Sequence, residues 1–504
     1  MKKNLLLLIF AITGSFLQAQ DNDMYSIIHH GQQGQFYDNR GLMQQRDGDF
    51  ITNSYVFDDL GNGNGIPLGH ILYKISPNTF TITDSLFIID TVMASFCSPE
   101  QNPNGEGNIL TNFKYHEDCD SCFLHIYHFT DNNITPIEDV VVPVCEGYAA
   151  GQVSLVDQRG DLIVQYSKET DPVHFSAYAA RFGMDGTLKH QAILCENETD
   201  IAGQLHILTE SPLKYYQWGS MVSNERYDNL VVYTLDSLFQ RNPIIINSKI
   251  SAAHEYFRVT YDTEVIPVGG NDILVAAEYV FEVNPSNPQE DELGVVVVKY
   301  DLRTMQMKGY ITFNDYPTIY KPAKCLGIKM MTDRTVYFLY TEEGYPEESF
   351  VAVKMDTDLN VEWKRFCKTD NIILHLLQHP VVCKDEQGEE KGIAWTGNGR
   401  IDNQFNSFFF FCLNHDGTVG TNESGIIVRP YAFYPNPVKD QLLMQFSPDV
   451  QPKQIELYDL QGRLVHSQSK AFESIDMSQL PAGTYTLCVT LKDGKTYSDK
   501  VVKE

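Results

Sequence analysis

The chain has 504 residues, with 38 Lys and Arg against 66 Asp and Glu, which gives a formal net charge of −28 at pH 7. This acidic balance argues against nucleic acid or an anionic membrane surface as the partner, because both would repel the protein. The hydrophobic content of 43% is too high for a disordered chain and is enough to build a core.

The N-terminus has the order of a secretory signal peptide. Lys2 and Lys3 precede an apolar run from Leu5 to Phe16, and the small residue Ala19 follows. This order predicts cleavage near Ala19, so we expect residues 1–19 to be a signal peptide. No later run approaches the roughly 20 apolar residues that a membrane-spanning helix needs. We therefore expect no transmembrane segment in the mature protein.

Residues 20–427 read as a chain of short strands, because runs of β-branched and aromatic residues alternate with turn signals and helical periodicity is almost absent. The runs recur in one order: an apolar strand, a long polar loop, a second apolar strand and a tight Asp or Asn turn. Apolar stretches between these units supply further strands. The two central strands of the seven units are expected at 50–57 and 70–75, 108–115 and 122–129, 161–166 and 176–182, 216–222 and 229–235, 272–281 and 294–300, 335–340 and 350–355, and 392–396 and 407–413.

The spacing of the units is about 56 residues, which is close to that of propeller blades with generous loops. It predicts an all-β, seven-bladed β-propeller over residues 20–427. Six or eight blades, with one unit misassigned, and an array of β-sandwiches remain as alternatives. The last unit lacks an outer strand after Gly417, and we expect Met24 to His29 to supply it by closing the ring.

One face of such a propeller carries the loops between second and third strands and the connections between blades. In this chain those loops hold many more acidic than basic residues. The simplest interpretation is that the charges keep the exposed loops soluble. The alternative is that the face attracts a basic partner or a divalent cation such as Ca²⁺. The candidate ligand-binding residues on this face are Asp58, Asp59, Glu169, Asp171, Asp228, Glu292, Glu343 and Asp402.

A second candidate site is the series His116, Cys119, Cys122 and His125, which offers four nitrogen and sulfur ligands for a tetrahedral Zn²⁺. Zinc is disfavoured, because such sites usually bring two ligand pairs from separated segments. A Cys119–Cys122 disulfide or free thiols are the alternatives. We expect most of the ten cysteines to be buried thiols, because most lie in apolar runs. No cofactor is therefore assigned with certainty.

From residue 428 to residue 504 the pattern becomes that of a small all-β domain. Pro435 and Pro437 stiffen its entry, and turns are expected at Gly462 and before Gly483. Together these signals predict a C-terminal β-sandwich.

Three motifs in this tail carry a resemblance to a known family. They are Tyr434-Pro435-Asn436-Pro437-Val438, the segment from Ile455 to Val465 around Gly462, and the segment from Leu480 to Tyr485 around Gly483. In this order they resemble the type A C-terminal sorting domain of the type IX secretion system of Bacteroidetes, whereas the propeller-like body matches no specific family. The resemblance implies contact with the type IX machinery, passage across the outer membrane, removal of the tail by a sortase-like protease, and release or attachment at the outer cell surface. It implies nothing about what the body does.

The sequence contains no Gly-x-Ser-x-Gly elbow, no His-Glu-x-x-His helix, no phosphate loop and no dinucleotide fingerprint. We therefore expect a secreted or surface-displayed propeller that binds a glycan or protein ligand on its long-loop face, rather than an enzyme, and no catalytic residue is assigned. The main alternative is a glycan or peptide hydrolase or lyase, in which two loop carboxylates act as acid and base and one has a raised pKa. A structural subunit of a surface layer is a third hypothesis.

Overall fold

The computed structural model describes residues 27–504 apart from gaps at 31–34, 60–64, 77–81, 90–93, 97–99, 102–106, 117–118, 131–132, 137, 148, 172–173, 199–204, 211–212, 222–228, 252–254, 261–262, 284–290, 314–322, 343–348, 370–372, 378–379, 386, 402–403, 416–425 and 435. Every regular element in this part of the chain is a β-strand. The signal peptide expected at residues 1–19 lies outside the described residues.

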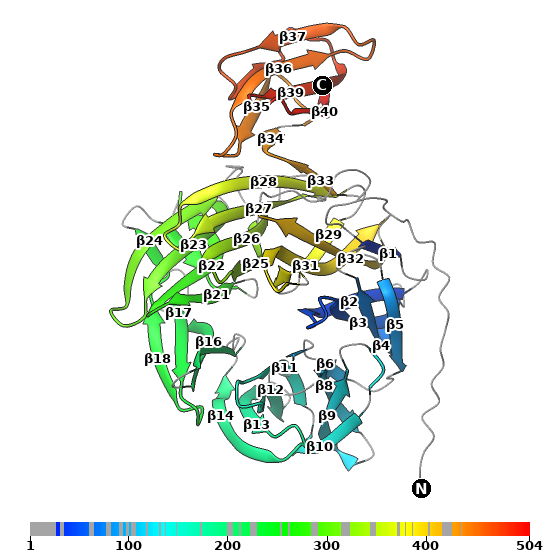
Figure 1. Ribbon diagram of the computed structural model, residues 1–504. Coiled ribbons are helices and arrows are strands. Elements are labelled where there is room, and N and C mark those ends of the chain that lie inside the picture. Colours follow the sequence, from blue (N-terminus) through cyan, green and yellow to red (C-terminus); the bar gives the residue numbers. More distant parts are fainter. Residues whose placement is uncertain are drawn as a thin grey trace.

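In the described residues, the strands of the body form seven antiparallel sheets arranged around a common centre (Figure 1). The first is β2 (Gln35–Gln44), β3 (Phe50–Asp59), β4 (Gly65–Ile75) and β5 (Ile82–Ile89). The second is β6 (Ala94–Phe96), β7 (Glu100–Gln101), β8 (Asn108–His116), β9 (Ser121–Phe129) and β10 (Glu138–Glu146). The third is β11 (Ala149–Val156), β12 (Leu162–Asp171), β13 (His174–Phe182) and β14 (Leu188–Glu198). The fourth is β15 (His206–Glu210), β16 (Leu213–Met221), β17 (Asn229–Leu235) and β18 (Arg241–Ile246).

The remaining three sheets of the body have five or six strands each. The fifth is β19 (Lys249–Ser251), β20 (Glu255–Arg258), β21 (Glu264–Gly269), β22 (Asp272–Phe281), β23 (Glu292–Asp301) and β24 (Gln306–Phe313). The sixth is β25 (Ala323–Met330), β26 (Thr335–Glu342), β27 (Ser349–Asp356), β28 (Val361–Thr369) and β33 (Ile426–Arg429). The seventh is β29 (Ile373–Leu377), β30 (Val381–Lys384), β31 (Glu390–Ile401), β32 (Gln404–Asn414) and β1 (Ile27–His30). Each pair of strands expected from the sequence repeat lies at the centre of a different sheet.

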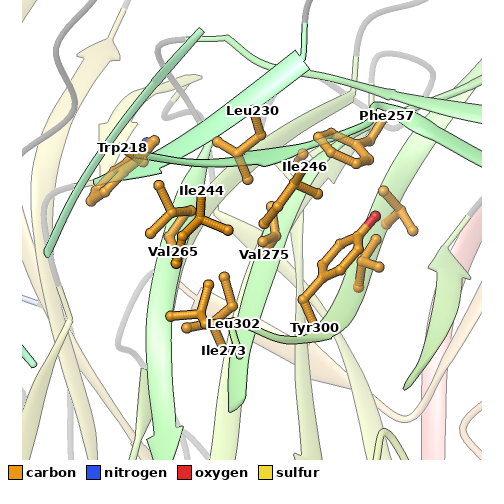
Figure 2. Close-up of a cluster of buried hydrophobic side chains, with 14 of the residues drawn as sticks. Trp218, Leu230, Ile244, Ile246, Phe257, Val265, Ile273, Val275, Tyr300 and Leu302 are labelled. Carbon is orange, nitrogen blue, oxygen red and sulfur yellow. The ribbon is translucent and has the colours of Figure 1, made fainter. Parts of the chain in front are cut away.

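Neighbouring sheets pack face to face around the whole ring. Between the fourth and fifth sheets, for example, Trp218 and Ile244 pack against Val275 and Tyr300 (Figure 2). The next residues along β22, including Leu274, pack on the opposite face against the sixth sheet. Because successive residues of a strand point to opposite faces, a strand buried on both faces must be apolar at nearly every position. This requirement explains the continuous apolar runs in the sequence.

The ring is closed by contacts between the two ends of the body. Strand β1 pairs with β32 in register from Ile27 with Phe410 to His30 with Ser407. Gln44 of the first sheet also binds Lys384 of the seventh sheet. Its Nε2 donates to the carbonyl oxygen of Lys384 at 2.7 Å, and its Oε1 accepts from the amide of Lys384 at 2.7 Å. The closure expected from the N-terminal segment is therefore confirmed.

The tail is a separate β-sandwich of two sheets around its own core, which includes Leu457, Leu487 and Val501. The all-β class, with a propeller followed by a small sandwich, is thus confirmed. The domain boundary expected after Ile427 falls inside β33, which pairs with β28 of the body. One sheet is β34 (Tyr431–Tyr434), β35 (Gln441–Phe446) and β38 (Ser474–Asp476), and the other is β37 (Leu464–Gln468), β36 (Pro452–Tyr458), β39 (Gly483–Leu491) and β40 (Thr496–Lys503).

Candidate functional site: the long-loop face

The up-and-down order of the strands gives the ring two different faces. Turns between the first and second strands of a sheet, and between the third and fourth, emerge on one face, which we call the tight-turn face. Loops between the second and third strands, and the connections from sheet to sheet, emerge on the other, which we call the long-loop face. The described turns of the tight-turn face include 157–161, 183–187, 236–240, 331–335, 356–360 and 385–389.

Aspartates cap the turns of the tight-turn face. Oδ1 of Asp356 accepts hydrogen bonds from the amides of Asp358 at 2.8 Å and Asn360 at 2.9 Å. Asp236 makes the same pair of bonds within its turn. Short acidic side chains suit this role because they reach their own backbone two residues on. Burial alone would raise the pKa of Asp356, but the hydrogen bonds from Asn360 and Asp358 outweigh it and lower the pKa.

Other acidic residues of the tight-turn face form ion pairs with Lys and Arg side chains of the third strands. Lys74 Nζ lies 2.9 Å from an oxygen of Asp49, and Arg181 Nε lies 4.0 Å from Asp161. Lys299 is 3.6 Å from Asp272. The acidic side chains described at these positions of the tight-turn face thus hold turns and strands in place, and sequence reasoning identified only the turns.

The predicted residues of the long-loop face lie at the corresponding ends of their strands. Asp58 is exposed near the end of β3, and Glu292 is half-buried at the start of β23. Asp59 and Asp171 are the last residues of β3 and β12, and Glu169 lies two residues before the end of β12. The structure describes the backbone of these three residues. The other three predicted residues, Asp228, Glu343 and Asp402, lie outside the described part of the chain.

The best-described polar group near this face is the Glu255 cluster, which comprises Ser251, Glu255, Tyr279 and Tyr310. Tyr279 Oη donates to Glu255 Oε1 at 2.8 Å, Tyr310 Oη donates to Oε2 at 3.0 Å, and Ser251 Oγ also donates to Oε2. Glu255 pairs with Phe281, the last residue of β22, which places the cluster at the base of the long loop between β22 and β23.

The electrostatics of the Glu255 cluster favour an ionised carboxylate. Burial alone would raise the pKa of Glu255, but the hydrogen bonds from Ser251, Tyr279 and Tyr310 outweigh it and lower the pKa. Burial and the charges of Glu255 and Glu292 raise the pKa of Tyr279, so its hydroxyl stays protonated. The cluster can therefore accept hydrogen bonds or attract a cation, and it is poorly suited to donate a proton.

The sequence did not point to Glu255, because this residue lies in β20 and not in a loop between second and third strands. Two of its three donors, Tyr279 and Tyr310, come from strands 24 and 55 residues further along the chain. No local spacing in the sequence links these tyrosines to Glu255.

The residues His116, Cys119, Cys122 and His125 have different surroundings in the structure. Cys122 is buried and its Sγ faces the carbonyl oxygen of Ala149 at 3.4 Å, whereas Cys119 is exposed. The two thiols are therefore in different environments, whereas the rings of His116 and His125 stack with their centroids 6.5 Å apart. Nδ1 of His125 lies 3.2 Å from Asp139. Across the described residues there is no group of three or more His, Cys, Asp or Glu placed to hold a metal ion.

The described cysteines agree with the expectation of buried thiols. Of the eight whose side chains are described, all are unbridged and five are buried. Burial, together with the neighbouring Cys145, raises the pKa of Cys122 to about 12. A thiol in this environment is not nucleophilic at neutral pH.

The tail motifs have structural roles. Asn436 Nδ2 donates to the carbonyl oxygen of Lys500 at 3.1 Å, and its Oδ1 accepts from the amide of Val502 at 2.8 Å. Asn436 therefore holds the C-terminal strand. Gly462 has φ = 75° in a turn capped by Asp459, and Gly483 begins β39. Pro435 lies outside the described residues.

Comparisons with known proteins give three results for the body. No curated protein matches the chain. A protein of unknown function from Dyadobacter fermentans is similar to it in structure with a TM-score of 0.41 and 8% identity, over 78% of this chain and 98% of that one. The β-propeller domain of the Trilobed protease from Pyrococcus furiosus is similar with a TM-score of 0.41 and 10% identity, over 77% and 97%. These scores are too low to carry an inference, so the propeller architecture rests on the sheets themselves.

The tail gives a specific result. Residues 432–504 match the family described as the secretion system C-terminal sorting domain. Within the described residues no helix has the length and apolarity needed to cross a membrane. The three motifs, the sandwich fold and the family match agree: the C-terminal domain of this protein is a type IX secretion sorting domain, which directs the protein to the cell surface or out of the cell.

Proposed function

We propose that this exported protein is a binding protein, released or displayed at the outer cell surface, whose ligand contacts the long-loop face of the propeller. A difference between the acidic residues of the two faces supports this proposal. On the tight-turn face, acids such as Asp49, Asp161 and Asp356 cap turns or pair with cations of their own sheets. The long-loop face carries exposed Asp58 and the ionised Glu255, and loops rich in acidic residues join its strands.

The charge of the long-loop face defines the class of ligand. Carboxylates gathered at one end of a ring add their fields and attract positive charge. A basic protein segment is one ligand that fits, and a glycan bound through Ca²⁺ is the other, because Ca²⁺ takes carboxylate oxygens as ligands.

A hydrolase or lyase using two loop carboxylates is the second candidate. Its general acid needs a raised pKa. Glu255, Asp333 and Asp385 each have a lowered pKa. These three carboxyl groups are therefore poor candidates for the general acid.

The test is binding of the purified full-length chain to an array of glycans and basic peptides, with and without Ca²⁺, while the mass of each bound ligand is followed by mass spectrometry. The proposal predicts saturable binding and an unchanged ligand mass. A ligand whose mass falls with time would contradict it and establish the hydrolase. Absence of binding to every basic or Ca²⁺-dependent ligand would also contradict it.

A further inference from the structure

The body and the sorting domain are joined by very little free chain. Strand β33 pairs with the outer edge of β28, in register from Phe366 with Arg429 to Thr369 with Ile426. Only Pro430 separates β33 from β34, the first strand of the sorting domain. The connection therefore runs from a strand of the sixth sheet almost directly into the sandwich.

The sorting domain continues the cover of β28 where β33 ends. Ser447, which is 1% exposed and follows β35, accepts a hydrogen bond at its Oγ from the amide of Lys364 at 2.7 Å. The amide of Ser447 donates to the carbonyl oxygen of Pro430 at 2.8 Å. A residue of the sorting domain thus binds a buried backbone donor at the edge of the body, which would be costly to leave unpaired.

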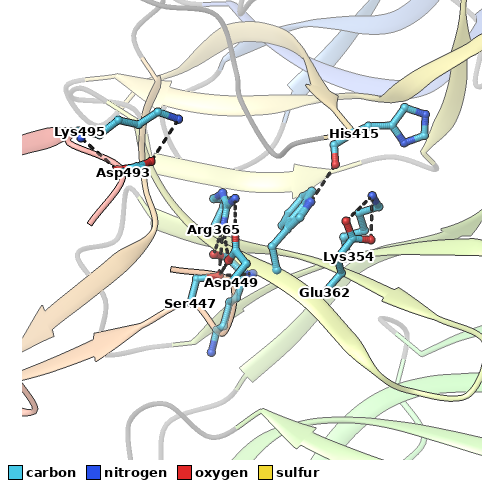
Figure 3. Close-up of polar contacts among 10 residues, drawn as sticks. Lys354, Glu362, Arg365, His415, Ser447, Asp449, Asp493 and Lys495 are labelled. Atoms are coloured by element: carbon cyan, nitrogen blue, oxygen red, sulfur yellow. Dashed lines mark hydrogen bonds and ion pairs between the residues drawn. The ribbon is translucent and has the colours of Figure 1, made fainter. Parts of the chain in front are cut away.

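An ion pair lies beside this hydrogen bond (Figure 3). Arg365 Nη1 donates to Asp449 Oδ1 at 2.9 Å, and Nη2 donates to Oδ2 at 2.7 Å. The side chain of Arg365 is 12% exposed and that of Asp449 is 29% exposed. Two parallel, partly buried bonds of this kind are stronger and more directional than an exposed ion pair.

The body holds its side of the contact in position. The guanidinium of Arg365 lies 5.0 Å from the ring of Trp363, and the indole of Trp363 donates to the carbonyl oxygen of His415 at 2.9 Å. The ammonium group of Lys364 lies 5.1 Å from the ring of Phe366. Contacts within the body therefore hold the guanidinium of Arg365 and the backbone amide of Lys364 in position before the sorting domain binds them.

Attraction between the net charges of the two domains does not explain the contact between the body and the sorting domain. The sorting domain has eight Lys and Arg against nine Asp and Glu between residues 432 and 504, whereas the whole chain has a net charge of −28. A nearly neutral domain gains little from the long-range field of an acidic body. Short-range contacts such as those of Ser447 and Asp449 must decide its position.

We propose that Lys364 and Arg365 of the body, with Ser447 and Asp449 of the sorting domain, form a latch that docks the sorting domain on the sixth sheet and shields the junction at Pro430. A protease can then separate the two domains only after the latch opens. The docked state depends on a folded sixth sheet, because β28 supplies both the buried donor and the arginine.

The test is limited proteolysis of the full-length chain with thermolysin, with the released tail identified by its mass. We expect Arg365→Ala and Asp449→Ala each to accelerate separation about tenfold, since a bond to a charged group is lost. The double variant is expected to be no faster than either single variant, because both changes remove the same contact. The exchange Arg365→Asp with Asp449→Arg is expected to restore most of the protection.

The matched control is Lys495→Ala, which removes an exposed ion pair with Asp493 inside the sorting domain (Figure 3). It should leave the rate unchanged. Circular dichroism of each variant separates loss of the latch from unfolding, and Asp449→Ala provides a variant whose body is unaltered. Rates within twofold of the original chain for Arg365→Ala and Asp449→Ala, or effects that simply multiply in the double variant, would overturn the proposal.

Discussion

The Glu255 cluster gives the sharpest stability prediction. Tyr279 is 6% exposed, and its hydroxyl donates to Glu255 at 2.8 Å. In Glu255→Ala this buried hydroxyl loses its acceptor, which costs about 1–3 kcal/mol, and the exposed bond from Tyr310 adds about 0.5–1 kcal/mol. We therefore expect Glu255→Ala to lower the free energy of unfolding by about 1.5–4 kcal/mol. Tyr279→Phe keeps the packed ring and should cost about 1–2 kcal/mol.

The double variant is the decisive part of this experiment. Because Tyr279→Phe removes the group that Glu255→Ala leaves unpaired, the combined loss should be about 1–2 kcal/mol smaller than the sum of the single losses. Urea unfolding followed by tryptophan fluorescence suits the measurement, since Trp218 packs in the same buried cluster as Tyr279. Additive single effects would refute the bond between Glu255 and Tyr279, and with it the account of the cluster.

Four further predictions follow from the turns, the tail and the thiols. Asp356→Ala removes the cap from the turn at 356–360 and should cost about 1 kcal/mol in urea unfolding; an unchanged midpoint would show that the turn does not depend on its cap. The pKa values of Asp356, Asp385 and Asp333 are lowered in the folded state, so their stabilisation is present above the unfolded value of about 3.9 and is lost as the pH falls through the folded values. The urea concentration at the unfolding midpoint, measured from pH 7 to pH 2.5, should therefore decrease once the pH is lower than about 4. A midpoint that increases in this acidic range would contradict the shifts. Asn436→Ala should speed amide exchange at Val502 about tenfold or more while the exposed control Lys470→Ala leaves it unchanged, and equal rates in both would exclude the proposed anchoring of β40. Under native conditions Cys119 should react quickly with a maleimide and Cys122 should not, and protection of Cys119 until reduction would instead support a disulfide.

The fold was largely predictable because its physics is local. Strands buried on both faces must be apolar along their length, as in Val295 to Val298, and the turns that separate them need Asp at fixed positions, as at Asp236 and Asp356. The tail motifs were equally visible, since Asn436 and Gly462 satisfy requirements of nearby backbone that few other residues meet.

The site was less predictable because its contacts join distant strands. Glu255 meets Tyr310 only after the fifth sheet has brought the two together. The regular spacing of His116, Cys119, Cys122 and His125 does not show which of these side chains share an environment, because a pleated strand sends Cys122 into the core while Cys119 stays at the exposed end. The contact between Arg365 and Asp449 spans two domains, so composition and periodicity give no sign of it.

The central claim, that the long-loop face binds the ligand, is tested most directly by reversing one exposed charge on each face. Asp58→Lys alters the long-loop face, and Glu389→Lys alters the tight-turn face, where the side chain of Glu389 is 71% exposed. Each full-length variant would be titrated with the strongest ligand found on the array. The account predicts that Asp58→Lys weakens binding about tenfold while Glu389→Lys binds as the original chain does. Equal affinities for all three proteins, or a loss confined to Glu389→Lys, would contradict it.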